Sequence, residues 1–218
     1  MIVSRRNAIV GLALAMAAPR VLAADATPAV PMGLSSEDAR EVARIVDYLQ
    51  GLTSARSGFV QTDARGARSE GTFYLQRPGR ARFDYDPPSG LVIASDGRNV
   101  TVVDRRLKTR HVYPLGATPL GLFLARTIRL DRGVAVRQVI REAGSVTIVA
   151  EDARHKSRGQ IALTFSENPL ALTGWELKDA RGGVVKVRLE GLSAAPPHDA
   201  GFFELSNPRT TPDPAAGG

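Results

Sequence analysis

The chain has 218 residues, of which 43% are hydrophobic and 23% charged, enough apolar material for the core of one domain and too much for a disordered chain. There is no cysteine, which excludes disulfides and thiolate metal sites, and we expect no lipid anchor on a cysteine. The formal net charge of +7 is spread along the sequence without a block of like charges, so nucleic-acid binding is not indicated.

The first residues have the pattern of a secretory signal. Arg5 and Arg6 precede an apolar run over 8–18, and small residues follow it up to Ala23. A basic segment, an apolar segment and a small-residue cleavage site together predict a signal peptide over 1–23. The apolar run is shorter than the roughly 20 residues that a membrane span needs. We therefore expect a periplasmic protein, exported by the general or the twin-arginine route.

The remaining chain divides into three parts by composition. Residues 24–34 and 207–218 are rich in alanine, proline and glycine, and they predict a disordered leader and a disordered tail. Residues 35–206 carry the periodic apolar pattern of a single folded domain.

The domain begins with a helical pattern. Ser35 and Asp38 have the spacing of a capping box, which marks the start of a helix. Apolar residues then recur at helical spacing and form one stripe: Val42, Ile45, Val46, Leu49 and Leu52. The pattern predicts an amphipathic helix that ends near Leu52 and lies on an apolar surface.

After Thr53 the apolar period changes from 3.6 to 2. Apolar and polar residues alternate in 72–76, 80–85, 160–165 and 185–190, and turn residues such as Pro, Gly, Asn and Asp separate such segments. This alternation predicts strands with one apolar and one wetter face. The regular series predicts an antiparallel meander, without the crossover helices of a parallel sheet.

One segment, 118–125, is apolar nearly all round. Thr118 as N-cap and Pro119 at the first helical position predict a helix of about two turns. Such a helix must either be buried or cover an apolar surface.

A series of short motifs between Val42 and Leu189 follows one order. It consists of Phe59-Val60-Gln61, Arg77-Pro78, the aromatic segment 82–88 that ends in two prolines, Ser95-Asp96-Gly97 and Thr118-Pro119-Leu120. This ordered series resembles the outer-membrane lipoprotein carrier family, often called LolA-type. Two departures concern cargo and docking more than fold: Phe83 stands where the family has tryptophan, and the C-terminal strand is shortened to 201–205.

The resemblance implies a curved antiparallel half-barrel, mainly β, with helices covering its concave apolar face. It implies that the space between sheet and helices takes the acyl chains of a lipoprotein. The partners would be an inner-membrane lipoprotein-releasing transporter and an outer-membrane receptor. Arg77 matches an arginine that bonds the covering helices, so we expect it to act as a lid latch.

The expected lipid-binding residues are the apolar members of the strands and of the short helix. They are Phe73, Leu75, Phe83, Tyr85, Ile93, Leu120, Leu122, Phe123, Leu124, Ile161, Leu163, Phe165, Trp175 and Val187. The same residues could simply form a packed core, and the pattern does not show which strand face lines the cavity. A covered aliphatic face would still attract lipid, because each buried methylene contributes about 0.8 kcal/mol.

Two other functions remain open. The fold could carry another lipid, such as a glycolipid, or could serve as a sensor of lipid or lipoprotein. An enzyme is not expected, because no nucleophile elbow and no Ser/His/Asp arrangement is present. We also expect no cofactor and no metal, since the three histidines have no ligand spacing.

Overall fold

The computed structural model describes residues 34–118, 120–128, 134–152, 159–179 and 182–206. The predicted signal peptide, the tail, Pro119 and all but the last residue of the predicted leader lie outside these ranges, as does the side chain of Leu122. None of the helices within these ranges is both long and apolar enough to cross a membrane.

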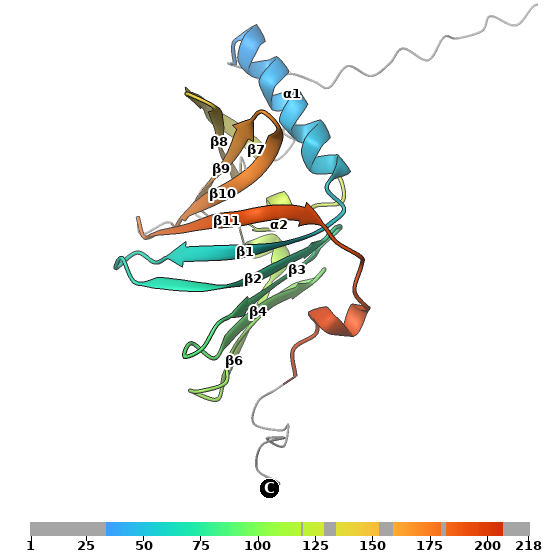
Figure 1. The fold of residues 1–218 in the computed structure, drawn as a ribbon, viewed down its shortest axis with the longest axis vertical. Helices are drawn as coiled ribbons and strands as arrows, with labels where there is room; N and C mark the ends of the chain where they lie inside the picture. Colours follow the sequence, from blue (N-terminus) through green and yellow to red (C-terminus); the bar gives the residue numbers. More distant parts are fainter. Residues whose placement is uncertain (1–33, 119, 129–133, 153–158, 180–181, 207–218) are drawn as a thin grey trace, which may run out of the picture.

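The described chain forms one antiparallel sheet of eleven strands in the order β6-β5-β4-β3-β2-β1-β11-β10-β9-β8-β7 (Figure 1). Both the mainly β fold and the antiparallel meander agree with the prediction from the alternating pattern. The strands are β1 (Ser54–Thr62), β2 (Arg68–Gln76), β3 (Arg80–Tyr85), β4 (Leu91–Asp96), β5 (Asn99–Asp104), β6 (Thr109–Pro114), β7 (Val134–Glu142), β8 (Ser145–Asp152), β9 (Gln160–Glu167), β10 (Leu170–Lys178) and β11 (Val184–Ala194).

The first and last strands, β1 and β11, lie side by side in the middle of the sheet. Each neighbouring pair on either side is a simple hairpin in sequence order. The edges β6 and β7 are consecutive along the chain, so their connection must cross the sheet. That connection contains the 3-10 turn η1 (Leu115–Ala117) and the helix α2 (Leu120–Phe123).

Helix α1 (Ser36–Gly51) begins and ends within about a residue of the prediction. The hydroxyl of Ser35 accepts a hydrogen bond from the backbone N–H of Asp38 at 3.0 Å, which caps the first turn. The carboxylate of Asp38 instead bonds Arg141 of β7 at 2.6 Å, so only half of the capping box forms. The predicted stripe is buried at Val42, Ile45 and Leu49.

Helix α2 has only four residues, so it is shorter than the two turns predicted. The hydroxyl of Thr118 donates to the carbonyl of Leu115 at 2.8 Å, so this side chain ties the helix to the preceding 3-10 turn. Among the described residues of the apolar segment 118–125, only the four of α2 are helical, and the 3-10 turn η1 precedes the segment.

Strand pairing places alternate residues on one face, which we call the inner face. Phe83 lies opposite both Phe73 and Ile93, and Leu163 lies opposite both Trp175 and Ile148. These inner residues belong to one continuous hydrophobic cluster together with residues of both helices. The inner face is thus the main core.

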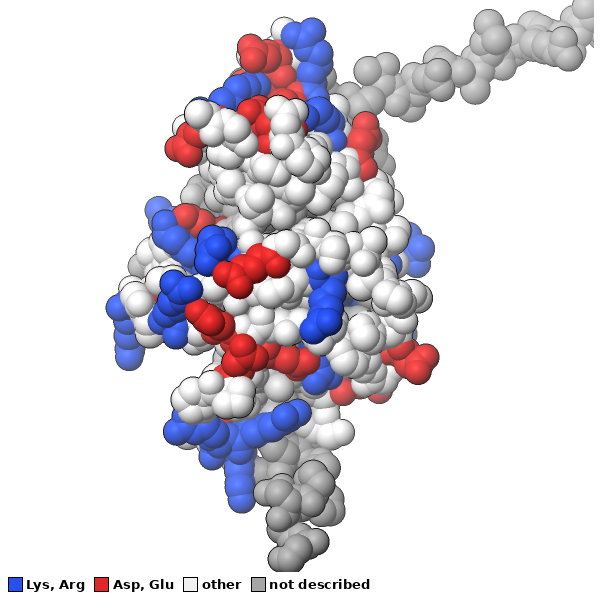
Figure 2. Space-filling view, in the orientation of Figure 1, with Lys and Arg blue, Asp and Glu red and all other residues white. Residues whose placement is uncertain are grey.

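The opposite, outer face is charged. Lys and Arg alternate with Asp and Glu over β11, β1 and β2 in Figure 2. Exposed ion pairs join Arg68 to Glu70 at 3.0 Å and Lys186 to Glu176 at 2.6 Å. The pleat therefore separates an apolar face from a wetted one.

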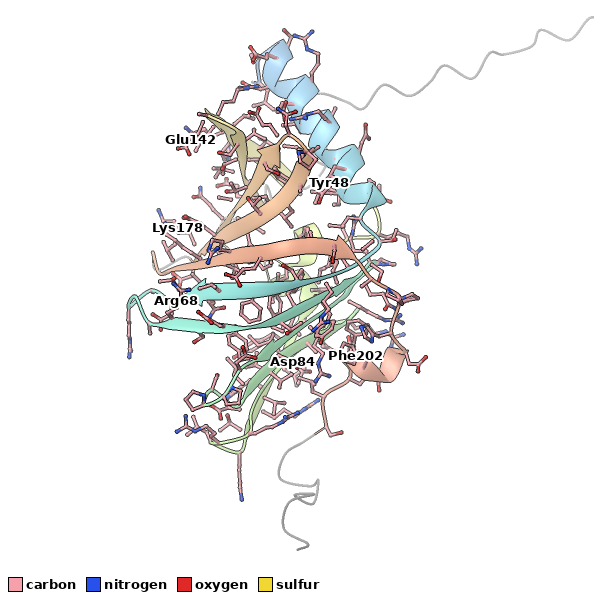
Figure 3. The ribbon with its side chains drawn as sticks, viewed as in Figure 1. Tyr48, Arg68, Asp84, Glu142, Lys178 and Phe202 are labelled. Carbon is pink, nitrogen blue, oxygen red and sulfur yellow. The ribbon has the colours of Figure 1, made fainter. Side chains whose placement is uncertain are left out.

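The C-terminal segment 195–206 departs from this rule, because it packs on the outer face. It contains the 3-10 turn η3 (Ala200–Phe203), which contacts β3 and β4. Arg82 of β3 bonds the carboxylate of Asp84 at 2.8 Å and the carbonyl of Phe202 at 2.5 Å, and Figure 3 shows the two partners near each other. Within this segment, the side chain of Phe203 is only 1% exposed.

Candidate functional site

An aromatic cluster occupies the centre of the inner face. The ring of Phe73 lies 4.7 Å from that of Phe83 and 5.4 Å from that of Trp175, measured between centroids. Phe59 of β1 meets Phe83 edge to face at 5.5 Å. These four side chains are at most 6% exposed, so the cluster is dry.

Helix α1 contacts the inner face near β9 and β10. The ring of Tyr48 meets Phe165 edge to face at 6.0 Å, and its hydroxyl accepts a hydrogen bond from the backbone N–H of Leu172 at 3.1 Å (Figure 3). Ile45 and Leu49 lie in the same apolar cluster. The helix is therefore attached both by apolar contact and by a directional hydrogen bond.

Helix α2 contacts the same face near its centre. The ring of Phe123 stacks on Trp175 at 6.3 Å, and Leu124 is fully buried. The carbonyl of Leu124 accepts a hydrogen bond from the backbone N–H of Gly79, in the turn between β2 and β3, at 2.8 Å. The end of this helix is thereby fixed to the end of β2.

Arg77 joins the ends of the two helices. Its guanidinium donates to the carbonyl of Leu49 in the last turn of α1, to the side-chain oxygen of Gln50 at 3.3 Å, and to the carbonyl of Ala125 just after α2 at 2.6 Å. The cation thus meets the negative end of the α1 dipole. Its Nε is buried without a hydrogen-bond partner among the described residues. Burial lowers the pKa of Arg77, but an arginine stays charged.

Tyr85 gives the inner face a polar point. Its hydroxyl donates to the side-chain oxygen of Gln61 at 2.7 Å, across from β3 to β1. Burial raises the pKa of Tyr85 to about 12, and the hydrogen bond with Gln61 opposes part of this effect. The pair satisfies two polar groups that would otherwise be costly to bury.

The structure places all ten predicted strand residues on the inner face. Most of the predicted lipid-binding residues are buried: Phe73, Leu75, Phe83, Tyr85, Phe123, Leu124, Ile161, Phe165, Trp175 and Val187. Ile93, Leu120 and Leu163 are partly buried. In this structure the chain's own helices and side chains therefore pack against the predicted binding residues.

Sequence reasoning missed several members of this face. They include Tyr48, Phe59, Val146, Ile148 and Leu172. The alternation in 145–150 could have revealed Val146 and Ile148. Leu172 could not be assigned in this way, because an irregularity between Leu172 and Gly174 shifts the register of β10.

The described residues contain no group of three or more His, Asp or Glu side chains that could hold a metal ion. The contacts described above are mainly apolar packing and hydrogen bonds to backbone groups. Together, the fold and the site define a class of single-sheet proteins with a continuous apolar face and one arginine that joins two helices.

Comparison with known proteins identifies the family. The family model described as "Outer membrane lipoprotein carrier protein LolA" matches residues 50–206. The chain belongs to this family, as the resemblance of its motifs indicated.

Relatives agree with this assignment, and a solved structure shares the fold. The chain is 32% identical to the outer-membrane lipoprotein carrier protein of Leptothrix cholodnii, over 71% of this chain and 77% of that protein. It is 30% identical to the protein of the same name from Legionella pneumophila (strain Lens), over 75% of this chain and 83% of the relative. A DUF1329 family protein from Desulfovibrio piger has a similar fold, with a TM-score of 0.50 and 10% identity, over 77% of this chain and 96% of the other.

Proposed function

We propose that this protein is a periplasmic carrier that shields the acyl chains of lipoproteins between the inner and the outer membrane. The observation that carries the proposal is the set of Arg77 hydrogen bonds, which join α1 to α2 beside a buried apolar face. The printed names of the relatives, outer-membrane lipoprotein carrier proteins, support the same cargo. The signal-peptide pattern before Ala23 supports export.

In this proposal the sheet is a half-barrel whose concave face is the inner face, and α1 and α2 are its cover. Acyl chains enter by displacing the helices from Phe165 and Trp175. The Arg77 bonds then break together, because one guanidinium makes all of them. Arg77 is thus a latch that favours the closed, empty state.

The energies are compatible with reversible carriage. A sixteen-carbon chain gains on the order of 10 kcal/mol from burial of its methylenes. Hydrogen bonds to a charged group contribute about 1.5–3 kcal/mol each, so opening the latch offsets a large part of this gain. The net free energy of cargo binding is therefore favourable but smaller than the burial term alone. A receptor that binds the acyl chains somewhat more tightly can then take the cargo.

The handover would involve an inner-membrane lipoprotein-releasing transporter and an outer-membrane receptor, as the family resemblance implies. A second candidate is a carrier or sensor of another lipid, such as a glycolipid. It rests on Phe83, which stands where the family has tryptophan and lies within the aromatic cluster. A smaller ring there changes the shape offered to the cargo.

Native mass spectrometry of the protein purified from its periplasm, with a co-expressed triacylated lipoprotein, tests the proposal. We expect a one-to-one complex that is absent when the lipoprotein lacks its acylated cysteine. We expect Arg77→Leu to retain cargo more firmly and to release it more slowly, since the latch stabilises only the empty state. Arg40→Leu, on an exposed position of α1, is the matched control.

Three results would change the account. A bound glycolipid would favour the second candidate, and a protein that stays empty would contradict lipid carriage. If Arg77→Leu and Arg40→Leu released cargo at the same rate as the unmodified protein, Arg77 would not be a latch.

A further inference from the structure

The hairpin formed by β5 and β6, residues 99–114, has an unusual surface. Leu107 is 72% exposed in its turn, and Tyr113 and Val112 of β6 are 49% and 43% exposed. No other large apolar side chain of the described residues is this exposed. Single exposed apolar residues are ordinary, but three on one hairpin set it apart from the rest of the described chain, and Leu107 at the turn is the most exposed of them.

The same hairpin is strongly basic. Arg105, Arg106 and Lys108 flank Leu107, and Arg110 follows at the start of β6; all four are exposed. Lys and Arg side chains gather at the lower end of the molecule in Figure 2, where Figure 1 shows the tip of the hairpin beside β6. An exposed leucine thus lies among cations.

The turn presents Leu107 in a defined position. The carboxylate of Asp104 accepts the backbone N–H groups of Arg106 and Leu107, both at 2.9 Å. The guanidinium of Arg106 donates to the carbonyl of Pro88 at 2.9 Å, which braces the turn against the neighbouring one. Asp104 therefore shapes the turn, and the side chain of Leu107 is left 72% exposed.

We propose that this hairpin docks the protein on the surface of an anionic phospholipid membrane. Leu107 would enter the headgroup region, and Arg105 and Arg110 would lie against the lipid phosphates. An apolar side chain surrounded by cations is the combination that interfacial membrane segments use. The apolar tip favours lipid over nucleic acid. Arg110 and Pro114 on β6 disfavour the addition of a partner strand to this edge.

The position of the hairpin suits this role. Its tip lies at the opposite end of the strands from Arg77, because β2 ends at the latch and the turn after β5 points the other way. A docked molecule therefore keeps α1 and α2 free to move. The inference goes beyond the proposed cargo and does not depend on it, since membrane docking can be measured with the empty protein.

One leucine and a few cations predict weak, reversible docking. Each basic side chain near an anionic surface strengthens binding about fivefold, and salt screens this contribution. Weak, salt-sensitive binding of this kind suits a protein that binds a membrane surface reversibly.

Vesicle co-sedimentation of the full mature chain tests the inference, with phosphatidylcholine vesicles that contain or lack phosphatidylglycerol. We expect binding only to the anionic vesicles, weakened by salt. The double variant Arg105→Gln/Arg110→Gln should bind about 30-fold more weakly, and Leu107→Ser at least about tenfold more weakly. Arg106 is left intact because it braces the turn.

The matched control is Arg40→Gln/Arg126→Gln, which removes the same charge from exposed positions outside the hairpin. It should bind as the unmodified protein does. Equal binding to both kinds of vesicle, no binding at low salt, or equal weakening of both double variants would overturn the inference. Circular dichroism of each variant verifies that it is folded, as the exposure of these side chains predicts.

Discussion

The two faces of the sheet are made by alternate residues of the same strands, yet they have opposite properties. In β2, Phe73 and Leu75 are at most 2% exposed on the inner face, whereas Arg68 and Glu70 form an exposed ion pair on the outer face. Burial of aromatic and aliphatic area stabilises the fold, and exposed ion pairs contribute little. The inner face therefore provides most of the stability and the candidate binding surface, while the charged outer face is exposed to water.

The inner face should show the largest effect of mutation. Phe165 is fully buried and meets Tyr48 of α1, so Phe165→Ala removes packing between helix and sheet. We expect a loss of about 3–5 kcal/mol in the free energy of unfolding, from lost burial and the cavity that remains. Urea unfolding measures it. A loss below about 1 kcal/mol would mean that the helix is not tightly packed on the sheet.

Alkaline pH should destabilise the protein through the same face. The folded state raises the pKa of Tyr85 from 10.0 to about 12 by burial. Between these values the unfolded chain loses the phenol proton and the folded chain keeps it, so stability is unaffected below pH 10 and falls as the pH rises towards 12. The decline attributable to Tyr85 is about 2–3 kcal/mol.

Comparison with Tyr85→Phe isolates this contribution from other groups that titrate at high pH. We expect unfolding free energies measured from pH 9 upwards to decline less steeply in the variant. Parallel curves for the two proteins would show that Tyr85 ionises freely in the folded state.

The outer face has one place where a substitution should matter. Phe202 stacks on His198 at 4.1 Å between ring centroids and lies under the guanidinium of Arg82 at 4.5 Å. We expect Phe202→Ala to cost about 1–2 kcal/mol, from lost aromatic and cation–π contacts. Thermal unfolding measures it. Glu204→Ala, an exposed neighbour, is the control and should leave the unfolding midpoint unchanged.

The ion pairs of the outer face should have the smallest effect. Lys186 and Glu176 meet at 2.6 Å, but their side chains are 61% and 45% exposed. We expect Glu176→Gln to change stability by at most about 0.5 kcal/mol, since solvent screens the pair. A loss of unfolding free energy as large as that of Phe165→Ala would contradict the proposed difference between the two faces.

Local patterns predicted the parts of the fold that depend on neighbours in sequence. The cap at Ser35 and the stripe through Ile45 are local, so α1 was predicted within about a residue. The alternation in 80–85 likewise predicted β3. Strand β6 lacks this signal, because nearly all its residues are exposed and only pairing with β5 defines it. The one-turn length of α2 depends on the preceding 3-10 turn, and η3 depends on contacts with β3 and β4.

The site was predictable in its residue types but not in its geometry. Alternation indicated which side chains share a face within one strand, whereas only the pairing of β1 with β11 shows that both halves of the sheet present one common face. The bonds of Arg77 reach Leu49 and Ala125, far away in sequence, so composition and period contain no sign of them. Family resemblance indicated its role, and the structure shows the contacts that the role would use.

The central claim is that acyl chains enter between the helices and the inner face. The chain has a single tryptophan, Trp175, which is 4% exposed on that face and stacked on Phe123 of α2. The most direct test is a fluorescence titration of the mature protein with an acylated lipoprotein peptide whose acyl chains carry bromine. Because bromine quenches only at contact, we predict saturable quenching of Trp175 at one peptide per protein, and none with the unbrominated peptide. Binding of the brominated peptide with undiminished Trp175 emission would contradict the account.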